Sequence, residues 1–268
     1  MLDTFEVIKS RQNPLVKEIR AALRAGQLTD RGLLPFEGPT LLQEAVKSQT
    51  AVESLLVTDP GLLNPSQRRW LKEQHTRVFQ VGPDILNSIS GTETPNSLIG
   101  LARVPRWDLE PCLDKERGLF IVLAELQDPG NLGTILRSSE AFGVTALLTT
   151  RGSVNAYNAK SVRASAGSIF RVPIFQGLRE PFLFQSFEDH HIPIVGASLK
   201  AREPADPCRL ELPMALIVGS EAKGLSDGIL RQCRHEVRID MNQSVQSLNA
   251  AIAASILLYE IRHHEHNR

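Results

Sequence analysis

Three short segments in the C-terminal half of the chain combine glycines with side chains that can hydrogen-bond or carry charge. They span residues 128–137, 219–225 and 239–249. Each begins where an apolar run of the β type ends. In an open α/β sheet, ligands bind in the crevice at the carboxyl ends of the strands. The three segments therefore predict one composite pocket.

In order and separation these segments resemble the three signature motifs of the SpoU (TrmH-type) RNA 2′-O-ribose methyltransferases, a family of the SPOUT superfamily. They read DPGNLGTILR, GSEAKGL, and IDM running on to SLN. The resemblance covers roughly residues 118–261. It implies S-adenosylmethionine as the methyl donor, RNA as the substrate, and a C-terminal parallel-sheet domain with a trefoil knot.

The resemblance also assigns roles to residues at matching positions. Five match the catalytic positions of the family: Asn131, Arg137, Glu221, Ser247 and Asn249. Four match positions that line the donor pocket: Gly219, Ile239, Met241 and Leu248. Asn131 and Arg137 are implied to lie against the ribose whose 2′-hydroxyl is methylated, and Glu221 to hold polar side chains of the third segment.

The first segment also has a purely structural interpretation. Pro129 and Gly130 would form a tight turn, and Asn131 would cap a helix that runs through residue 141. Gly143 suits the left-handed position after that helix. Arg137 would then pair on the surface with Glu140.

The second and third segments have structural alternatives as well. Glu221 would complement a helix dipole, and Ser247 would cap a helix predicted over residues 248–262. That helix carries a face of small residues: Ala250, Ala251, Ala253, Ala254 and Ser255. Because catalytic domains of the family pair as homodimers through this region, the face is a candidate dimer interface, and ordinary core packing is the alternative.

The third segment departs from the family pattern at two positions. Asp240 stands where the family usually has proline, and Gln243 stands where it has glycine. Ala222 replaces a frequent glycine in the second segment. A side chain at Gln243 could crowd the donor pocket or lower its affinity. A non-catalytic RNA-binding protein on the same scaffold is therefore the first rival hypothesis.

Methyl transfer to a ribose requires that a weak oxygen nucleophile be aligned with a sulfonium and lose a proton. A guanidinium stays charged at physiological pH, and a neutral arginine at pH 7 would cost roughly 7 kcal/mol. We therefore expect a cationic Arg137 to aim the hydroxyl and stabilise the developing alkoxide. Asn131, Ser247 and Asn249 would contribute by positioning.

The N-terminal part predicts a small alternating α/β domain over residues 1–104. Its expected helices begin at Pro14, Gly38 and Pro65, and its expected strands end near Glu37, Val57 and Val81. The domain resembles the ribosomal-protein-like substrate-binding domain that often precedes the SpoU catalytic domain in enzymes of large ribosomal RNA. Ribosomal RNA is therefore favoured over transfer RNA as the substrate.

A proline-containing stretch at residues 104–111 predicts a linker, followed by a catalytic domain over residues 117–268. In this domain six short apolar runs alternate with helical ones: residues 119–126, 145–149, 171–175, 193–197, 215–218 and 236–239. Such runs are typical of a parallel sheet covered on both faces.

The 268 residues contain 30 basic and 30 acidic side chains, so the net charge is zero. Nucleic-acid-binding domains usually carry a basic excess, and a small-molecule α/β enzyme of another class is therefore the second rival. Local basic groups offset this argument. Among them, Arg11, Lys17 and Arg163 are the candidate RNA-binding residues. The alternative is that these basic groups belong to two ordinary solvent-exposed faces that bind nothing.

The remaining composition limits the chemistry. Cys112, Cys208 and Cys233 are isolated, which argues against a disulfide framework and favours a reducing cytoplasm. The histidines show no ligand spacing, so no metal is expected. No apolar stretch approaches the roughly 20 residues that span a bilayer, and no GxGxxG turn supports a dinucleotide site.

Overall fold

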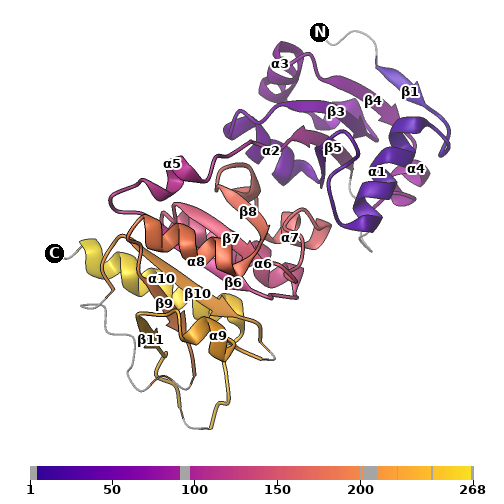
Figure 1. Cartoon of the computed structure of the whole chain (residues 1–268). Coiled ribbons are helices and arrows are strands. Elements are labelled where there is room, and N and C mark those ends of the chain that lie inside the picture. The colour runs from indigo at the N-terminus through magenta and orange to yellow at the C-terminus, as the bar shows by residue number, and fades with distance from the viewer. Residues whose placement is uncertain are drawn as a thin grey trace. The chain divides into compact units, whose positions relative to one another are not determined.

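The computed structural model describes residues 5–90, 97–199, 201, 210–221, 223–242 and 244–266 (Figure 1). The chain forms two compact units. The first contains residues 1–106 and 155–171, and the second contains residues 107–154 and 172–268. Residues 155–171 lie in the later half of the sequence, yet their contacts place them in the first unit.

The first unit is built on a five-stranded sheet in the order β1-β4-β3-β5-β2. The strands are β1 (Glu6–Ile8), β2 (Leu33–Glu37), β3 (Val52–Val57), β4 (Arg77–Val81) and β5 (Leu98–Arg103). β5 runs antiparallel to both of its neighbours, whereas the other pairs are parallel. The predicted alternating α/β arrangement is confirmed, with one antiparallel strand added.

Each α-helix of residues 1–106 begins with a proline: α1 (Pro14–Ala25), α2 (Pro39–Lys47), α3 (Pro65–Glu73) and α4 (Pro83–Asn87). Proline suits the first helical position because it lacks an amide hydrogen that would have no partner there. A short 3₁₀ turn, η1 (Pro60–Leu62), precedes α3. The three predicted helices are confirmed.

The sequence did not indicate β5, because Gly100 interrupts its apolar run. A Cβ atom at Gly100 would lie 2.2 Å from the Phe36 ring, so the ring of β2 occupies the space of the missing side chain. Phe36 is 1% exposed, and its burial against the opposite strand therefore requires glycine at this point.

The second unit contains a six-stranded sheet in the order β11-β9-β10-β6-β7-β8, and its pairs are all parallel. The strands are β6 (Leu119–Ala124), β7 (Ala146–Thr150), β8 (Ile174–Leu178), β9 (Ile194–Ala197), β10 (Met214–Gly219) and β11 (His235–Val237). The predicted parallel sheet is confirmed. β8 begins three residues later than predicted, after the 3₁₀ turn η2 (Ser168–Phe170).

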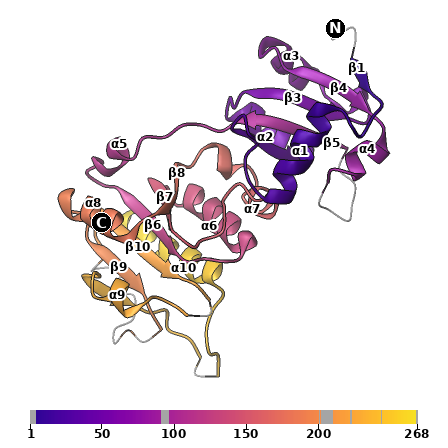
Figure 2. The ribbon, with the colours of Figure 1, turned by 45° about the vertical axis from the view of Figure 1, so that its right-hand side comes forward.

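Helices cover both faces of this sheet (Figure 2). They are α5 (Glu110–Leu113), α6 (Pro129–Ala141), α8 (Glu180–Asp189), α9 (Asp227–Leu230) and α10 (Ala250–His266), while α7 (Ala159–Ala164) joins the first unit. Alternate residues of β6 face opposite sides. Phe120 packs against Phe187 of α8, with ring centroids 5.7 Å apart. On the other face, α6 packs against α10.

Candidate active site

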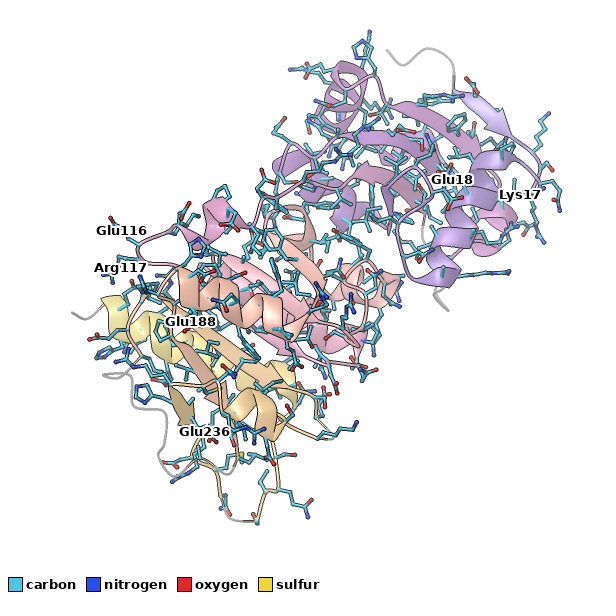
Figure 3. The ribbon with its side chains drawn as sticks, viewed as in Figure 1. Lys17, Glu18, Glu116, Arg117, Glu188 and Glu236 are labelled. Atoms are coloured by element: carbon cyan, nitrogen blue, oxygen red, sulfur yellow. The ribbon has the colours of Figure 1, made fainter. Side chains whose placement is uncertain are left out.

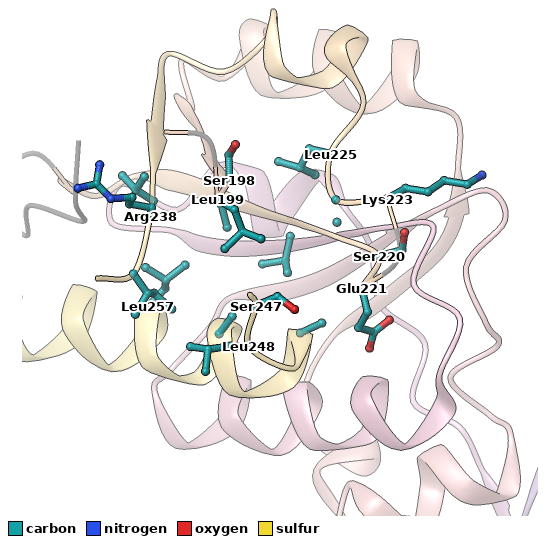
Figure 4. A pocket seen from close by; sticks show the side chains of 18 of the residues that line it. Ser198, Leu199, Ser220, Glu221, Lys223, Leu225, Arg238, Ser247, Leu248 and Leu257 are labelled. Carbon is teal, nitrogen blue, oxygen red and sulfur yellow. The ribbon is translucent and has the colours of Figure 1, made fainter. Parts of the chain in front are cut away.

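A cavity of about 290 Å³ lies in the second unit, where β9, β10 and β11 end and α10 begins (Figure 4). Its wall contains the four residues expected to line a donor pocket: Gly219, Ile239, Met241 and Leu248. Glu221 and Ser247 line it as well. The strand ends therefore converge on one cavity, as the three segments predicted.

Part of this wall was not predicted from the sequence. Ser198 and Leu199 follow β9, and Leu257 belongs to the third turn of α10. β9 pairs with β10 and therefore brings a further strand end to the same crevice. The apolar run of β9 was visible in the sequence, but its place beside β10 was not, because the order of strands in a sheet is a nonlocal property.

The loop after β10 closes tightly on itself. The Gly224 amide donates to the Ser220 carbonyl at 2.8 Å, and Gly224 has φ +65°. A Cβ atom at Gly219 would lie 2.2 Å from the Gly224 carbonyl carbon. Glycine at position 219 therefore permits a close approach of two backbone segments and leaves its side of the cavity open.

Gly219→Ala is expected to lower the free energy of unfolding by about 1–3 kcal/mol, because the added methyl group must displace backbone. The dissociation constant for S-adenosylmethionine should rise about tenfold, corresponding to ~1.4 kcal/mol, since the displaced loop lines the cavity. Chemical denaturation and calorimetry measure the two effects. The control is Gly228→Ala in α9, where the nearest atom to a new Cβ lies at 3.6 Å. Unchanged affinity in the Gly219 variant would contradict this description of the loop.

A chain of polar side chains lies beside this loop. The Asn131 side-chain amide donates to Glu221, and the Asn249 side-chain amide donates to the Asn131 side-chain oxygen at 2.9 Å. Asn131 therefore stands between the second and third segments. The expected support of the third segment by Glu221 passes through Asn131 among the described residues: Glu221 accepts from the Asn131 amide, and the Asn131 oxygen accepts from Asn249.

The expected cap of α6 was wrong. Asp128 is the N-cap, and its carboxylate accepts from the Asn131 backbone amide at 2.9 Å. Pro129 takes the first helical position, so the helix begins three residues earlier than a cap at Asn131 would have it. The Asn131 side chain is consequently left to bond with Glu221 and Asn249. The predicted end of the helix is confirmed, with Gly143 at φ +63°.

The expected cap of α10 was also wrong. The helix begins at Ala250 rather than near Leu248, and its bounds extend to His266. The Asn249 side-chain oxygen accepts from the backbone amides of Ala251 at 2.9 Å and Ile252 at 3.3 Å. Ser247 is exposed in the preceding loop. Asn249 thus uses its oxygen to cap α10 and its amide nitrogen to bind Asn131.

Arg137 lies on the exposed surface of α6 and does not line the cavity. Its side chain has no hydrogen bond or ion pair with the residues that the structure describes, so the alternative pair with Glu140 is not formed. The neighbouring Ser138 hydroxyl lies 2.6 Å from that of Ser255 in α10. The chain therefore brings Asn131, Glu221 and Asn249 into one network and Ser247 onto the cavity wall, but it leaves Arg137 outside both.

The small-residue face of α10 packs within the chain. Ala250, Ala251 and Ala254 are buried, and Ala250 also lines the cavity. Core packing is thus the correct interpretation of these residues. The apolar side chains that α10 does expose are Ile252, at 51%, and Tyr259, at 48%.

The candidate RNA-binding residues all belong to the first unit. Arg11 precedes α1 and Lys17 lies on it, and both are exposed. Figure 3 shows Lys17 extending from α1. Arg163 on α7 is half-buried, and its Nη1 atom is buried without a hydrogen-bond partner in the described part of the chain.

Of the three positions at which the chain departs from the family pattern, the structure describes Asp240 alone. The Asp240 carboxylate is largely exposed, pairs with Arg238 at 3.3 Å and does not line the cavity, so it does not crowd a ligand. Ala222 and Gln243 lie outside the described residues. The nearby Cys233 offers no nucleophile, because burial raises the pKa of its thiol to about 12.

Cys112 and Cys233 are free thiols, and Cys208 lies outside the described residues. Within the described ranges, no helix is long and apolar enough to cross a membrane. The same residues include no cluster of His, Cys, Asp or Glu that could hold a metal ion.

Comparison with known proteins gives consistent matches. Residues 118–259 match the SpoU rRNA Methylase family, and residues 13–100 match the MRM3-like substrate binding domain. An uncharacterized tRNA/rRNA methyltransferase of Synechocystis is 32% identical over 95% of this chain and 93% of its own length. The 23S rRNA (guanosine(2553)-2′-O)-methyltransferase RlmP of Bacillus subtilis is 29% identical over 95% of this chain and 98% of its own.

Solved structures match over nearly the whole chain. The SpoU methyltransferase AviRb of Streptomyces viridochromogenes, in complex with the cofactor AdoMet, superposes with a TM-score of 0.82 at 27% identity. That match covers 95% of this chain and 98% of the other. An AdoMet-bound rRNA methyltransferase of Sinorhizobium meliloti has a TM-score of 0.84 at 24% identity, over 97% and 98% of the two chains, and so shares the fold.

Proposed function

Because the chain belongs to the SpoU rRNA methylase family, we propose that it transfers a methyl group from S-adenosylmethionine to the 2′-oxygen of a ribose in structured RNA. One observation carries the proposal. The cavity formed by the ends of β9, β10 and β11 adjoins a network that joins all three sequence segments through Asn131. A donor site and polar groups for an acceptor are thus adjacent.

The cavity residues fit S-adenosylmethionine. The volume of the cavity is close to the lower end of the range for small-molecule pockets. Apolar side chains of Val218, Ile239 and Leu248 offer contacts for an adenine ring, and Gly219 leaves backbone within reach. When bound, the sulfonium supplies an electrophilic methyl group.

The remaining steps belong to the residues of the chain. We propose that Asn131 and Asn249 orient the ribose and that Glu221 fixes the Asn131 amide. The Ser247 hydroxyl faces the cavity and is available to the ribose as well (Figure 4). A cationic Arg137 would aim the 2′-hydroxyl and stabilise the alkoxide as the proton leaves.

We place the substrate-binding domain at residues 1–104 and the catalytic domain at residues 117–268. Exposed Arg11 and Lys17 are the proposed RNA contacts of the first domain. Arg163 is a third proposed contact; it falls within residues 117–268 by sequence and in the first compact unit by its contacts. Ribosomal RNA is the favoured substrate, because RlmP and a uridine methyltransferase of Streptomyces viridochromogenes are named for 23S rRNA. Transfer RNA is the alternative, since other relatives are named for both. A ribosomal substrate also favours a cytoplasmic location.

The catalytic domain is proposed to form a homodimer and to share the trefoil knot of its family. Ile252 and Tyr259, exposed on α10, support an interface there. Full-length superposition on a SpoU methyltransferase supports the knot. Sedimentation analysis should show a dimer that Tyr259→Glu weakens, and a monomeric wild type would refute the proposed assembly.

The function is tested by incubating the protein with ribosomal RNA and S-adenosylmethionine carrying a labelled methyl group. We expect one labelled 2′-O-methyl nucleoside after nuclease digestion, identified by mass spectrometry. Donor binding without transfer on either ribosomal or transfer RNA would favour another activity on the same scaffold. Absence of donor binding in calorimetry would favour the non-catalytic RNA-binding protein. RNA affinity without salt dependence would favour a small-molecule enzyme.

A further inference from the structure

The tight loop after β10 presents two opposite charges at its tip. Ser220 and Gly224 form an isolated bridge that closes the loop. Glu221 and Lys223 lie between them, and both are exposed and line the cavity. In Figure 4 the Glu221 carboxylate points toward the two helices below the loop, whereas the Lys223 side chain extends away from them. The loop therefore presents a carboxylate and an ammonium group that point in different directions.

Two of the described residues that line the cavity are cationic, Lys223 and Arg238, and they differ in the bonds that their side chains make. Arg238 donates to the Ala201 carbonyl at 2.9 Å and pairs with Asp240 at 3.3 Å. Lys223 has no hydrogen bond or ion pair with any residue that the structure describes. Lys223 is therefore the cation of this wall that can meet an incoming anion without breaking an existing bond.

A ribose in RNA cannot approach this site without its phosphates. The 3′-phosphate is attached to the carbon next to the one that carries the 2′-hydroxyl, so it must lie close to the Asn131 network. Glu221 and Asp227 are carboxylates on the same wall and would repel it. A nearby cation offsets this repulsion, and a lysine ammonium binds phosphate as a point charge.

We propose that Lys223 binds the RNA phosphate adjacent to the methylated ribose. The inference rests on the proposed function and adds a substrate contact in the catalytic domain to the contacts expected from the first unit. In this proposal the two charged residues of the loop have different roles. Glu221 fixes the Asn131 amide, and Lys223 fixes the backbone of the nucleotide whose ribose that amide orients.

The test measures binding and turnover with an in vitro transcript of large-subunit ribosomal RNA across a series of salt concentrations. Each phosphate contact contributes about 0.7 to 0.9 to the slope of log affinity against log salt. Lys223→Gln should reduce the magnitude of that slope by about 0.7 to 0.9, the contribution of one phosphate contact. It should also raise the KM for RNA about tenfold at low salt. Its kcat at saturating RNA and its calorimetric affinity for S-adenosylmethionine should stay within about twofold of wild type.

Two further variants separate a phosphate contact from other roles. Lys223→Arg should retain the wild-type slope, because it keeps the charge. Lys115→Gln removes an exposed lysine of the same unit that does not line the cavity, and it should change nothing. An unchanged slope in Lys223→Gln would overturn the proposal, as would a wild type whose RNA affinity has no salt slope. A protein that binds RNA but transfers no methyl group would refute the proposed function, while the slope would still decide the role of Lys223.

Discussion

Arg137→Lys is expected to lower kcat about 100-fold or more, while the dissociation constant for S-adenosylmethionine stays unchanged. Lysine retains the positive charge but lacks the planar set of donors that can hold an oxygen in a defined direction. Removing a donor that stabilises a developing oxyanion typically costs a factor of about 10² to 10³. The affinity for the donor should persist, because Arg137 does not line the cavity. Single-turnover kinetics with saturating RNA measures this effect.

The matched control is Arg179→Lys, which alters an exposed arginine of the same unit just before α8. It should leave all kinetic constants unchanged. A near-wild-type rate for Arg137→Lys would rule out aiming by the guanidinium and leave charge alone as its contribution. Because Arg137 is exposed and its side chain bonds to none of the residues that the structure describes, its variants should also unfold at the wild-type temperature.

Asn131→Ala is expected to lower kcat by about 10² and to leave the stability of the fold almost unchanged. The substitution removes the link between Glu221 and Asn249, and therefore frees the Glu221 carboxylate and the Asn249 amide nitrogen from their bonds to Asn131. Helix α6 should persist, because its N-cap is Asp128. Comparison of kcat with the thermal unfolding midpoint separates the two effects.

Thr134→Ala is the control on the same helix. Its hydroxyl is exposed and bonds only to the Gly130 carbonyl at 2.9 Å among the contacts described. Loss of activity in both variants to the same degree would indicate damage to α6 rather than to the network. Full activity in Asn131→Ala would remove the network from the mechanism.

The parallel sheet and part of the cavity wall could be predicted from the sequence. Buried parallel strands read as continuous apolar runs, and ligand groups follow directly at their carboxyl ends. Gly219 ends β10 and Ile239 follows β11 by two residues, whereas Leu248 lies just before α10. The place of these three residues on the cavity wall was implied by the resemblance of the segments to the SpoU family.

The helix caps could not be predicted, because several residues competed for the same task. Asp128 and Asn131 can both cap a helix, and Ser247 and Asn249 can do the same for α10. The proline at position 129 decides the first case, since it fixes the first helical residue. In the second case Asn249 also bonds with Asn131, a residue far away in sequence, and local reasoning does not include that contact.

The place of residues 155–171 was also beyond local reasoning. Phe170 makes an edge contact with Phe36 at 6.2 Å between ring centroids, and Arg171 pairs with Glu44 at 3.0 Å. These contacts join distant parts of the sequence within the first unit. The segment forms α7 and the turn η2, but its own sequence does not show the unit against which they pack.

The most direct test of the account is a crystal structure of the protein with S-adenosylhomocysteine. We predict that the adenine lies in the cavity between Gly219 and Leu248, with the sulfur atom at the end where Glu221 meets Asn131. That position would place a methyl group beside the proposed ribose site. Density for the ligand outside this cavity, or a sulfur atom at the opposite end near Arg238, would contradict the account.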